Sequence, residues 1–194
     1  MAQAVLAELG AAPDLVFVFV SPHHASSWSE IPNLLRAAFG DAVVIGGSGA
    51  GVVGEGHEVE QRTAIALFAG LLPGVQLFPF ELGPPVDLPE EGDRAGWCAR
   101  LAMPSDVETR GIVLFAEPFG GQAERLIDSI VSAFPEATLV GGVASGAPFP
   151  GGSALFTSTG SVPLGAVGVV LCGDVRIEAV VSQGCRAVGP PMLI

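Results

Sequence analysis

The sequence predicts an α/β fold made of two tandem β-α-β-β-β units, packed as a layered α/β/β/α sandwich with pseudo-two-fold symmetry. One observation is a repeat: residues 12–80 and 109–181 carry apolar and glycine-rich segments in the same order, offset by roughly 95 to 100 positions. The other is that each unit opens with a short apolar run followed by a segment of helical periodicity. A single continuous mixed sheet is the alternative. The whole chain, 1–194, is expected to form one domain.

The first unit begins with a buried strand and a helix. Residues 15–20 are apolar and rich in β-branched and aromatic side chains, which is typical of a strand. Residues 26–39 place apolar side chains at helical spacing, and Pro32 is expected in the first turn, where its missing N–H costs nothing. Hydroxyl side chains that precede this turn are the expected N-caps: Ser26, Ser27 and Ser29.

The second unit repeats this design. Residues 112–116 predict its first strand, and 121–134 carry an apolar stripe that predicts a helix packed on a sheet. A second strand follows each helix, at 41–45 and at 137–140. A short connection through one helix implies that the two strands it joins are parallel.

Further strands are expected to form hairpins. In the first unit, 64–70 and 74–78 are separated by the spacing of a β-hairpin, and in the second unit 166–173 and 174–178 occupy the same place. Between the units, 81–96 is rich in proline and acidic residues and predicts a solvated linker. A short helix is expected over 94–102 and a strand, a turn and the start of another strand over 180–194.

Charge excludes several classes of protein. The net charge is −12, with eight arginines and no lysine, so a nucleic acid would be repelled. Without lysine, neither a P-loop nor a Schiff-base mechanism is available. No stretch reaches about 18 apolar residues, and the N-terminus lacks a basic secretory start, so we expect a cytoplasmic protein without membrane insertion.

Cysteine and histidine usage predicts neither a disulfide scaffold nor a metal site. The three cysteines are widely spaced, and the three histidines match no metal-ligand pattern. These residues are Cys98, Cys172, Cys185, His23, His24 and His57. We therefore expect no metal and no cofactor.

Glycine-rich segments follow the second strand of each unit and are the strongest candidates for a binding site. Small residues at the carboxyl ends of parallel strands leave room and free backbone N–H groups for a small polar ligand. The alternative is that these glycines serve only close packing. The candidate ligand-binding residues here are Gly46, Gly47, Ser48, Gly49, Gly141, Gly142 and Ser145.

A dinucleotide site is not favoured, although Gly49–Gly54 matches the GxGxxG pattern. That fingerprint needs a helix that starts at the loop and an acidic residue about 20 positions later. Gly54 and Gly56 interrupt any such helix, and Ala69 occupies the acidic position.

The segment 181–190 supplies three more candidate ligand-binding residues. Gln183 and Arg186 are candidate polar contacts, the latter for an anion, and Cys185 lies between them. A nucleophilic Cys185 next to a guanidinium is a less favoured alternative, since its general base would have to come from a distant histidine. The chain is therefore not expected to be an enzyme.

Taken together, several segments resemble the N-terminal domain of the FIST family. In the first half they are 46–52, 58–60 and 72–75, and in the second half 140–146, 165–169 and 182–190. The resemblance implies an intracellular sensory domain of the kind found with bacterial signalling modules and in some F-box proteins. It also implies binding of a small ligand such as an amino acid, and a separate C-terminal FIST domain, which is expected to be absent here.

The resulting hypothesis is a sensory domain that binds a small polar or anionic ligand, such as an amino acid, and is coupled to signal transduction. The alternative is a protein-interaction scaffold without a small-molecule pocket, which would dock a C-terminal FIST domain or a signalling protein. A homodimer is a further expectation, because the strand that is expected to start near Ile194 stops short, and such a strand end invites pairing with a second chain.

Overall fold

The computed structural model describes residues 1–83, 88–120 and 123–181. The helices are α1 (Ala2–Leu9), η1 (Pro22–Ser27, a 3-10 helix), α2 (Ile31–Phe39), α3 (Arg94–Arg100) and α4 (Ala123–Ala133). The strands of the first half are β1 (Leu15–Val20), β2 (Val43–Ser48), β3 (Gly51–Gly54), β4 (His57–Glu60), β5 (Ile65–Gly70) and β6 (Val75–Leu82). Those of the second half are β7 (Thr109–Ala116), β8 (Thr138–Val143), β9 (Leu155–Thr157), β10 (Ser161–Val162) and β11 (Ala166–Gly173).

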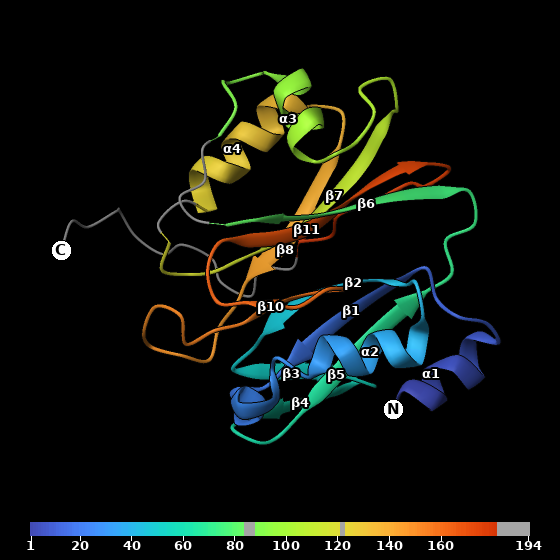
Figure 1. The fold of residues 1–194 in the computed structure, drawn as a ribbon, viewed down its shortest axis with the longest axis vertical. Coiled ribbons are helices and arrows are strands. Elements are labelled where there is room, and N and C mark those ends of the chain that lie inside the picture. The colour runs from blue at the N-terminus through green and yellow to red at the C-terminus, as the bar shows by residue number, and fades with distance from the viewer. Residues whose placement is uncertain (84–87, 121–122, 182–194) are drawn as a thin grey trace, which may run out of the picture.

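Two sheets lie face to face with helices on both outer faces, which confirms the α/β class and its layered α/β/β/α form (Figure 1). The first sheet has the strand order β10-β9-β2-β1-β5, and the second has the order β6-β11-β7-β8. Helices α1 and α2 cover the first sheet, and α3 and α4 cover the second (Figure 1). Strands β3 and β4 form a separate hairpin.

Apolar cores fill the three interfaces between these four layers. Trp97, Leu126 and Ile130 belong to the core under α3 and α4, which also receives side chains from β7 and β11. A second core lies between β1 and α2, and a third between the sheets, where Ile45 and Val169 meet. Each sheet is therefore apolar on both faces, as expected of strands that are buried on both sides.

Both main helices form where the sequence places them, but the N-cap prediction for α2 is wrong. Pro32 lies in the first turn as expected, and because proline has no N–H it fixes the start of the helix close to Ile31. The preceding serines lie in or near η1, and Glu30 occupies the cap position without a side-chain hydrogen bond. In the second half, α4 covers Ala123–Ala133 of the predicted 121–134.

The two sheets share one pattern of strand pairing. In the first, β1 pairs parallel with β2 and antiparallel with β5. In the second, β7 pairs parallel with β8 and antiparallel with β11. The β-α-β connections through α2 and α4 are thus parallel, as predicted. Whether this likeness reflects an internal duplication stays a prediction.

The predicted hairpin between β5 and β6 is wrong, because the two strands lie in different sheets. Strand β5 pairs with β1, and β6 crosses to pair antiparallel with β11. At the start of this crossing, the Asp14 carboxylate accepts the Leu72 N–H at 2.6 Å. Strand β6 is apolar on both faces: Phe80 contacts the core under the helices, and Leu77 contacts the core between the sheets. It therefore buries more surface in the second sheet than a two-stranded hairpin would allow.

The strand predicted over 174–178 is also absent. Its place beside β11 is already taken, since β11 has β6 on one side and β7 on the other. The segment instead packs Val175 and Ile177 against the core between the sheets, and the Thr138 hydroxyl donates to the Ile177 carbonyl at 3.3 Å. Of the predicted 180–194, residues 180 and 181 are not strand and 182–194 lie outside the described residues.

The core between the sheets predicts a sharp contrast between two apolar residues. Ile45 is fully buried there, so Ile45→Ala should lower the free energy of unfolding by about 2–5 kcal/mol through lost burial and a new cavity. Leu34 on α2 is 66% exposed, so Leu34→Ala should change it by less than about 0.5 kcal/mol. Urea unfolding monitored by circular dichroism measures both. Equal losses would contradict the assignment of the sheet interface as a core.

Candidate functional site

The two glycine-rich segments lie at the carboxyl ends of β2 and β8 and contact each other directly. The Ser145 N–H donates to the Ser48 carbonyl at 3.0 Å, and the Ser48 hydroxyl donates to the Ser145 carbonyl at 3.1 Å. The Ser145 hydroxyl in turn accepts the Ala50 N–H at 3.1 Å. The structure thus brings together the two loops that the sequence predicts as one site.

Ser48 also holds a third segment. Its hydroxyl accepts the Ala154 N–H at 3.1 Å, and its own N–H donates to the Ala154 carbonyl at 2.8 Å. The next N–H, that of Gly49, donates to Val20. The expectation of free backbone N–H groups is therefore wrong for 48–50, because each of these groups already has a protein acceptor. Ser48 joins β2 to two other segments and has no donor left for a ligand.

Gly46 and Gly141 serve close packing within their sheets. Each lies opposite a residue of the neighbouring parallel strand, Gly46 opposite Val18 and Gly141 opposite Leu114. A Cβ at either position would overlap the carbonyl oxygen of that opposite residue. Close packing, which was the alternative to ligand binding, therefore explains the first glycine of each Gly-Gly pair.

The other glycines differ between the two sheets. Gly47 is buried, because β9 pairs with β2 and sets Leu155 opposite it. Gly142 is exposed, and a Cβ there would meet no atom within 4 Å. Among the described residues no strand pairs with the outer edge of β8. Gly142 is thus the predicted residue with open space around it.

A cavity of about 210 Å³ opens beside these exposed glycines, between β8 and α4. Apart from the two glycines, its walls are apolar. The lining residues are Leu114, Ala116, Ala123, Ile127, Leu139, Val140, Gly141, Gly142 and Val143. The space is below the range of about 300–1,000 Å³ that drug-sized ligands occupy, and suits a small aliphatic group.

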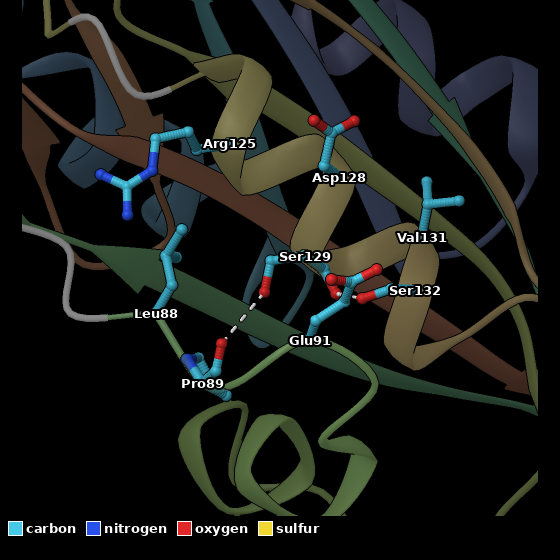
Figure 2. A pocket seen from close by; sticks show the side chains of 8 residues that line it. All are labelled: Leu88, Pro89, Glu91, Arg125, Asp128, Ser129, Val131 and Ser132. Atoms are coloured by element: carbon cyan, nitrogen blue, oxygen red, sulfur yellow. Dashed lines mark hydrogen bonds between the residues drawn. The ribbon is translucent and has the colours of Figure 1, made fainter.

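A larger cavity, of about 640 Å³, lies away from the glycine loops, between α4 and residues 88–91 (Figure 2). Its lining residues are Leu88, Pro89, Glu91, Arg125, Asp128, Ser129, Val131 and Ser132. Figure 2 shows Ser129 pointing at Pro89, to whose carbonyl its hydroxyl donates at 3.4 Å. The Ser132 hydroxyl accepts the Gly92 N–H at 3.1 Å. Both serines therefore hold the connecting segment onto α4, which explains their polarity without a ligand.

Sequence reasoning missed two buried polar residues near the loops. Glu117 follows β7 and is 3% exposed, and Ser153 precedes Ala154 and is 1% exposed. Neither carboxylate oxygen of Glu117 has a hydrogen-bond partner, nor does the Ser153 hydroxyl. The sequence did offer one signal for Glu117. It follows the first strand of its unit and precedes a proline, as Ser21 does in the first unit.

The remaining predicted site residues are three, and the other two cysteines of the chain are described with them. Gln183, Cys185 and Arg186 lie outside the described residues, so their place relative to the loops stays a prediction. Cys98 and Cys172 are buried free thiols, and burial raises the pKa of both above the ordinary value, although Arg94 acts in the opposite direction. A raised pKa disfavours the thiolate that a nucleophile needs.

Two further predictions concern ions and nucleotides. Residues 51–54 form β3 rather than a helix, so the GxGxxG match lacks the helix N-terminus that a pyrophosphate needs. Within the described ranges, no group of three or more His, Cys, Asp or Glu side chains is placed to hold a metal ion. No helix in the same ranges is long and apolar enough to cross a membrane.

The described chain is thus a two-sheet α/β sandwich whose two glycine-rich loops meet at the carboxyl ends of β2 and β8. The family model of the FIST N domain matches residues 14–194, and the chain belongs to this family of sensory domains.

The chain is also similar to proteins of mycobacteria. The chain is 27% identical over 195 residues to an uncharacterized protein of Mycobacterium tuberculosis (strain ATCC 25618 / H37Rv), which covers 95% of this chain and 46% of the relative. It is 27% identical over 186 residues to an uncharacterized protein of Mycobacterium bovis (strain ATCC BAA-935 / AF2122/97), with the same two shares. The chain thus spans about half the length of the curated relatives it matches.

The packing of the glycines predicts opposite effects of the same substitution at two site positions. Gly46→Ala places a methyl group against the Val18 carbonyl and should lower the free energy of unfolding by about 1–3 kcal/mol or more. Gly142→Ala meets open space and should leave it unchanged or raise it by up to about 1 kcal/mol. Thermal unfolding of the two variants measures the difference. A Gly142→Ala variant as unstable as Gly46→Ala would refute the open position of Gly142.

Proposed function

We propose that this chain is a non-enzymatic sensory domain, acting in the cytoplasm, that binds a small polar molecule at the carboxyl ends of β2 and β8 and passes its occupancy to a signalling partner. The observation that carries the proposal is the meeting of the two glycine loops beside an open cavity. The Ser48–Ser145 contact brings the loops together, and Gly141 and Gly142 form part of the cavity wall. Membership of the FIST N domain family supports a sensory role.

The arrangement favours binding over catalysis. A nucleophile needs a base within hydrogen-bond reach, and the described cysteines are buried with raised pKa values. The cavity walls carry no ionisable side chain. By contrast, a closely packed platform of glycine and serine with one open side can hold a ligand and respond to it.

A thermal-shift screen tests the proposal, because a ligand that binds only the folded state raises its stability. The panel contains amino acids, carboxylates, aliphatic amines and nucleotides. We expect one class to raise the melting temperature by several degrees, and Gly142→Leu to remove that rise by filling the open space beside the cavity.

The matched control is Gly70→Leu at the end of β5, where a Cβ also meets no atom within 4 Å. This variant should keep the ligand-dependent rise. If no compound in the panel stabilises the wild-type chain, or if Gly142→Leu responds as the wild type does, the proposed site is wrong.

A second candidate function, an interaction scaffold, is favoured by one observation at the edge of the first sheet. Phe68 on β5 is 70% exposed although its strand is apolar, and no described strand pairs with the outer edge of β5. An exposed apolar edge is a template for pairing with another chain. We take a second copy of this chain as its occupant, since two β5 edges can pair antiparallel about a two-fold axis.

The scaffold function predicts self-association that depends on this edge. The wild-type chain should sediment as a dimer at micromolar concentration, and Phe68→Ser should sediment as a monomer of unchanged stability. Phe149, which is 59% exposed but lies on a loop, provides the control Phe149→Ser, which should remain dimeric. A wild-type monomer at all concentrations would contradict this function.

A further inference from the structure

The outer edge of β8 lacks the strand that covers the matching edge of the first sheet. Gly46 of β2 and Gly141 of β8 are matching positions, because a Cβ on either would overlap the carbonyl oxygen of the opposite residue in the parallel neighbour. On the other side of β2, Phe156 of β9 pairs antiparallel with Gly46. Among the described residues, β8 has a neighbouring strand only on the side of β7. The two sheets therefore differ by one strand at this edge.

Backbone groups of β8 face this open edge. In β2, the Ser48 N–H points to the β9 side and donates to the Ala154 carbonyl at 2.8 Å. The matching residue of β8 is Val143. The residue after it, Ala144, donates its N–H back to Ala116 of β7 at 2.8 Å, so the Val143 N–H points away from β7, because successive backbone groups of a strand alternate in direction. Such an edge is a template for a further strand.

The cavity between β8 and α4 lies where a phenylalanine lies in the first sheet. Phe156, which pairs with Gly46, is fully buried in the core between β1 and α2. In the second sheet, Gly141 lines the cavity, whose walls are apolar. An apolar cavity of about 150 Å³ can hold a benzene ring, so a cavity of about 210 Å³ has room for one phenyl side chain. The cavity thus matches the side chain that β9 supplies to the first sheet.

The surroundings of the cavity are apolar and exposed, whereas the chain as a whole is acidic. Ile127 of α4 and Val143 both line the cavity and are 41% and 55% exposed, so only another molecule would remove them from water. The described lining residues carry no ionisable group. The net charge of −12 attracts a basic partner and repels an acidic one. A basic, extended segment with an aromatic side chain is the occupant that fits.

We propose that an extended basic segment of a signalling protein pairs antiparallel with the edge of β8 and places an aromatic side chain opposite Gly141, in the cavity between β8 and α4. This inference rests on the proposed function and names the contact by which the signalling partner meets the site. The segment adds the strand that β9 adds to the first sheet. Main-chain hydrogen bonds supply the affinity, and the cavity selects the aromatic residue.

The probe is a labelled synthetic peptide with the sequence of residues 153–159 and a lysine at each end, titrated with the full chain by fluorescence polarisation. We expect saturable binding. Phe156→Ala in the peptide should weaken that binding at least about tenfold, because no ring then fills the cavity. Equal affinities of the two peptides, or no binding of either, would overturn the inference.

A matched pair of variants on α4 tests the cavity from the other side. Ile127→Asp places a carboxylate in the cavity wall and should weaken peptide binding at least about tenfold. Val131 is 47% exposed on the same helix and does not line this cavity, so Val131→Asp adds the same charge and should bind the peptide like the wild type. Wild-type affinity of Ile127→Asp would overturn the inference.

Hydrogen exchange of the chain without peptide gives a second readout. The Ser48 N–H is held by Ala154 and should exchange slowly. The matching Val143 N–H should exchange fast and become protected when the peptide binds. A Val143 N–H as slow as that of Ser48 without peptide would show that the chain itself or a second copy already covers the edge, and would overturn the inference.

The outcomes separate this inference from the proposed function. A compound of the thermal-shift panel that stabilises the chain, together with no binding of the peptide, would overturn the β8 contact and leave the sensory function standing. Peptide binding together with a flat panel would support the β8 contact and overturn the small-molecule function.

Discussion

The arrangement of this domain depends on the hydrogen bonds of one buried serine. Ser48 ends β2, and its hydroxyl and backbone bond to residues 145 and 154, which follow β8 and precede β9. The residue is 4% exposed, so water cannot take the place of these partners. Through Ser48 the ends of the two sheets are held together, and β9 is set against the edge of β2.

That constraint gives the two sheets different edges. Strand β2 is covered by β9 and its glycines are buried, whereas β8 keeps an exposed edge with Gly141, Gly142 and a cavity behind it. The two sheets have the same strand pairing but contribute differently to the candidate site. In the first sheet the end of β2 is buried under β9, whereas in the second sheet the edge of β8 is exposed. Glu117 follows β7 with both carboxylate oxygens unpartnered, whereas Ser21, the matching residue of the first sheet, accepts a backbone N–H.

Much of the fold could be predicted from the sequence, because the periodicity of the apolar residues identifies the strands and helices and their order along the chain indicates two similar units. The apolar run 15–20 and the helical stripe of α4 have clear periods, and the repeat of their order predicted two similar sheets. Strand partners could not be predicted the same way. The turn before β6 has the spacing of a hairpin, yet the apolar character of both faces of β6 places it in the other sheet.

The site was predicted in part for a similar reason. Glycines at strand ends are visible in a sequence, and the structure brings both loops together. Their roles depend on which strand lies opposite, so Gly46 and Gly142 could not be told apart from sequence. Glu117 was missed because a glutamate becomes unusual only when it is buried. Its position before a proline does not show from the sequence that it is buried.

The most direct measurement is the map of amide chemical-shift changes when the compound that most raises the melting temperature in the ligand panel is added to the ¹⁵N-labelled chain. We expect saturable changes at Ala123, Gly142 and Val143, around the cavity between β8 and α4. Changes confined to Gly92, Ser129 and Ser132, around the larger cavity of Figure 2, would place the ligand elsewhere and contradict it.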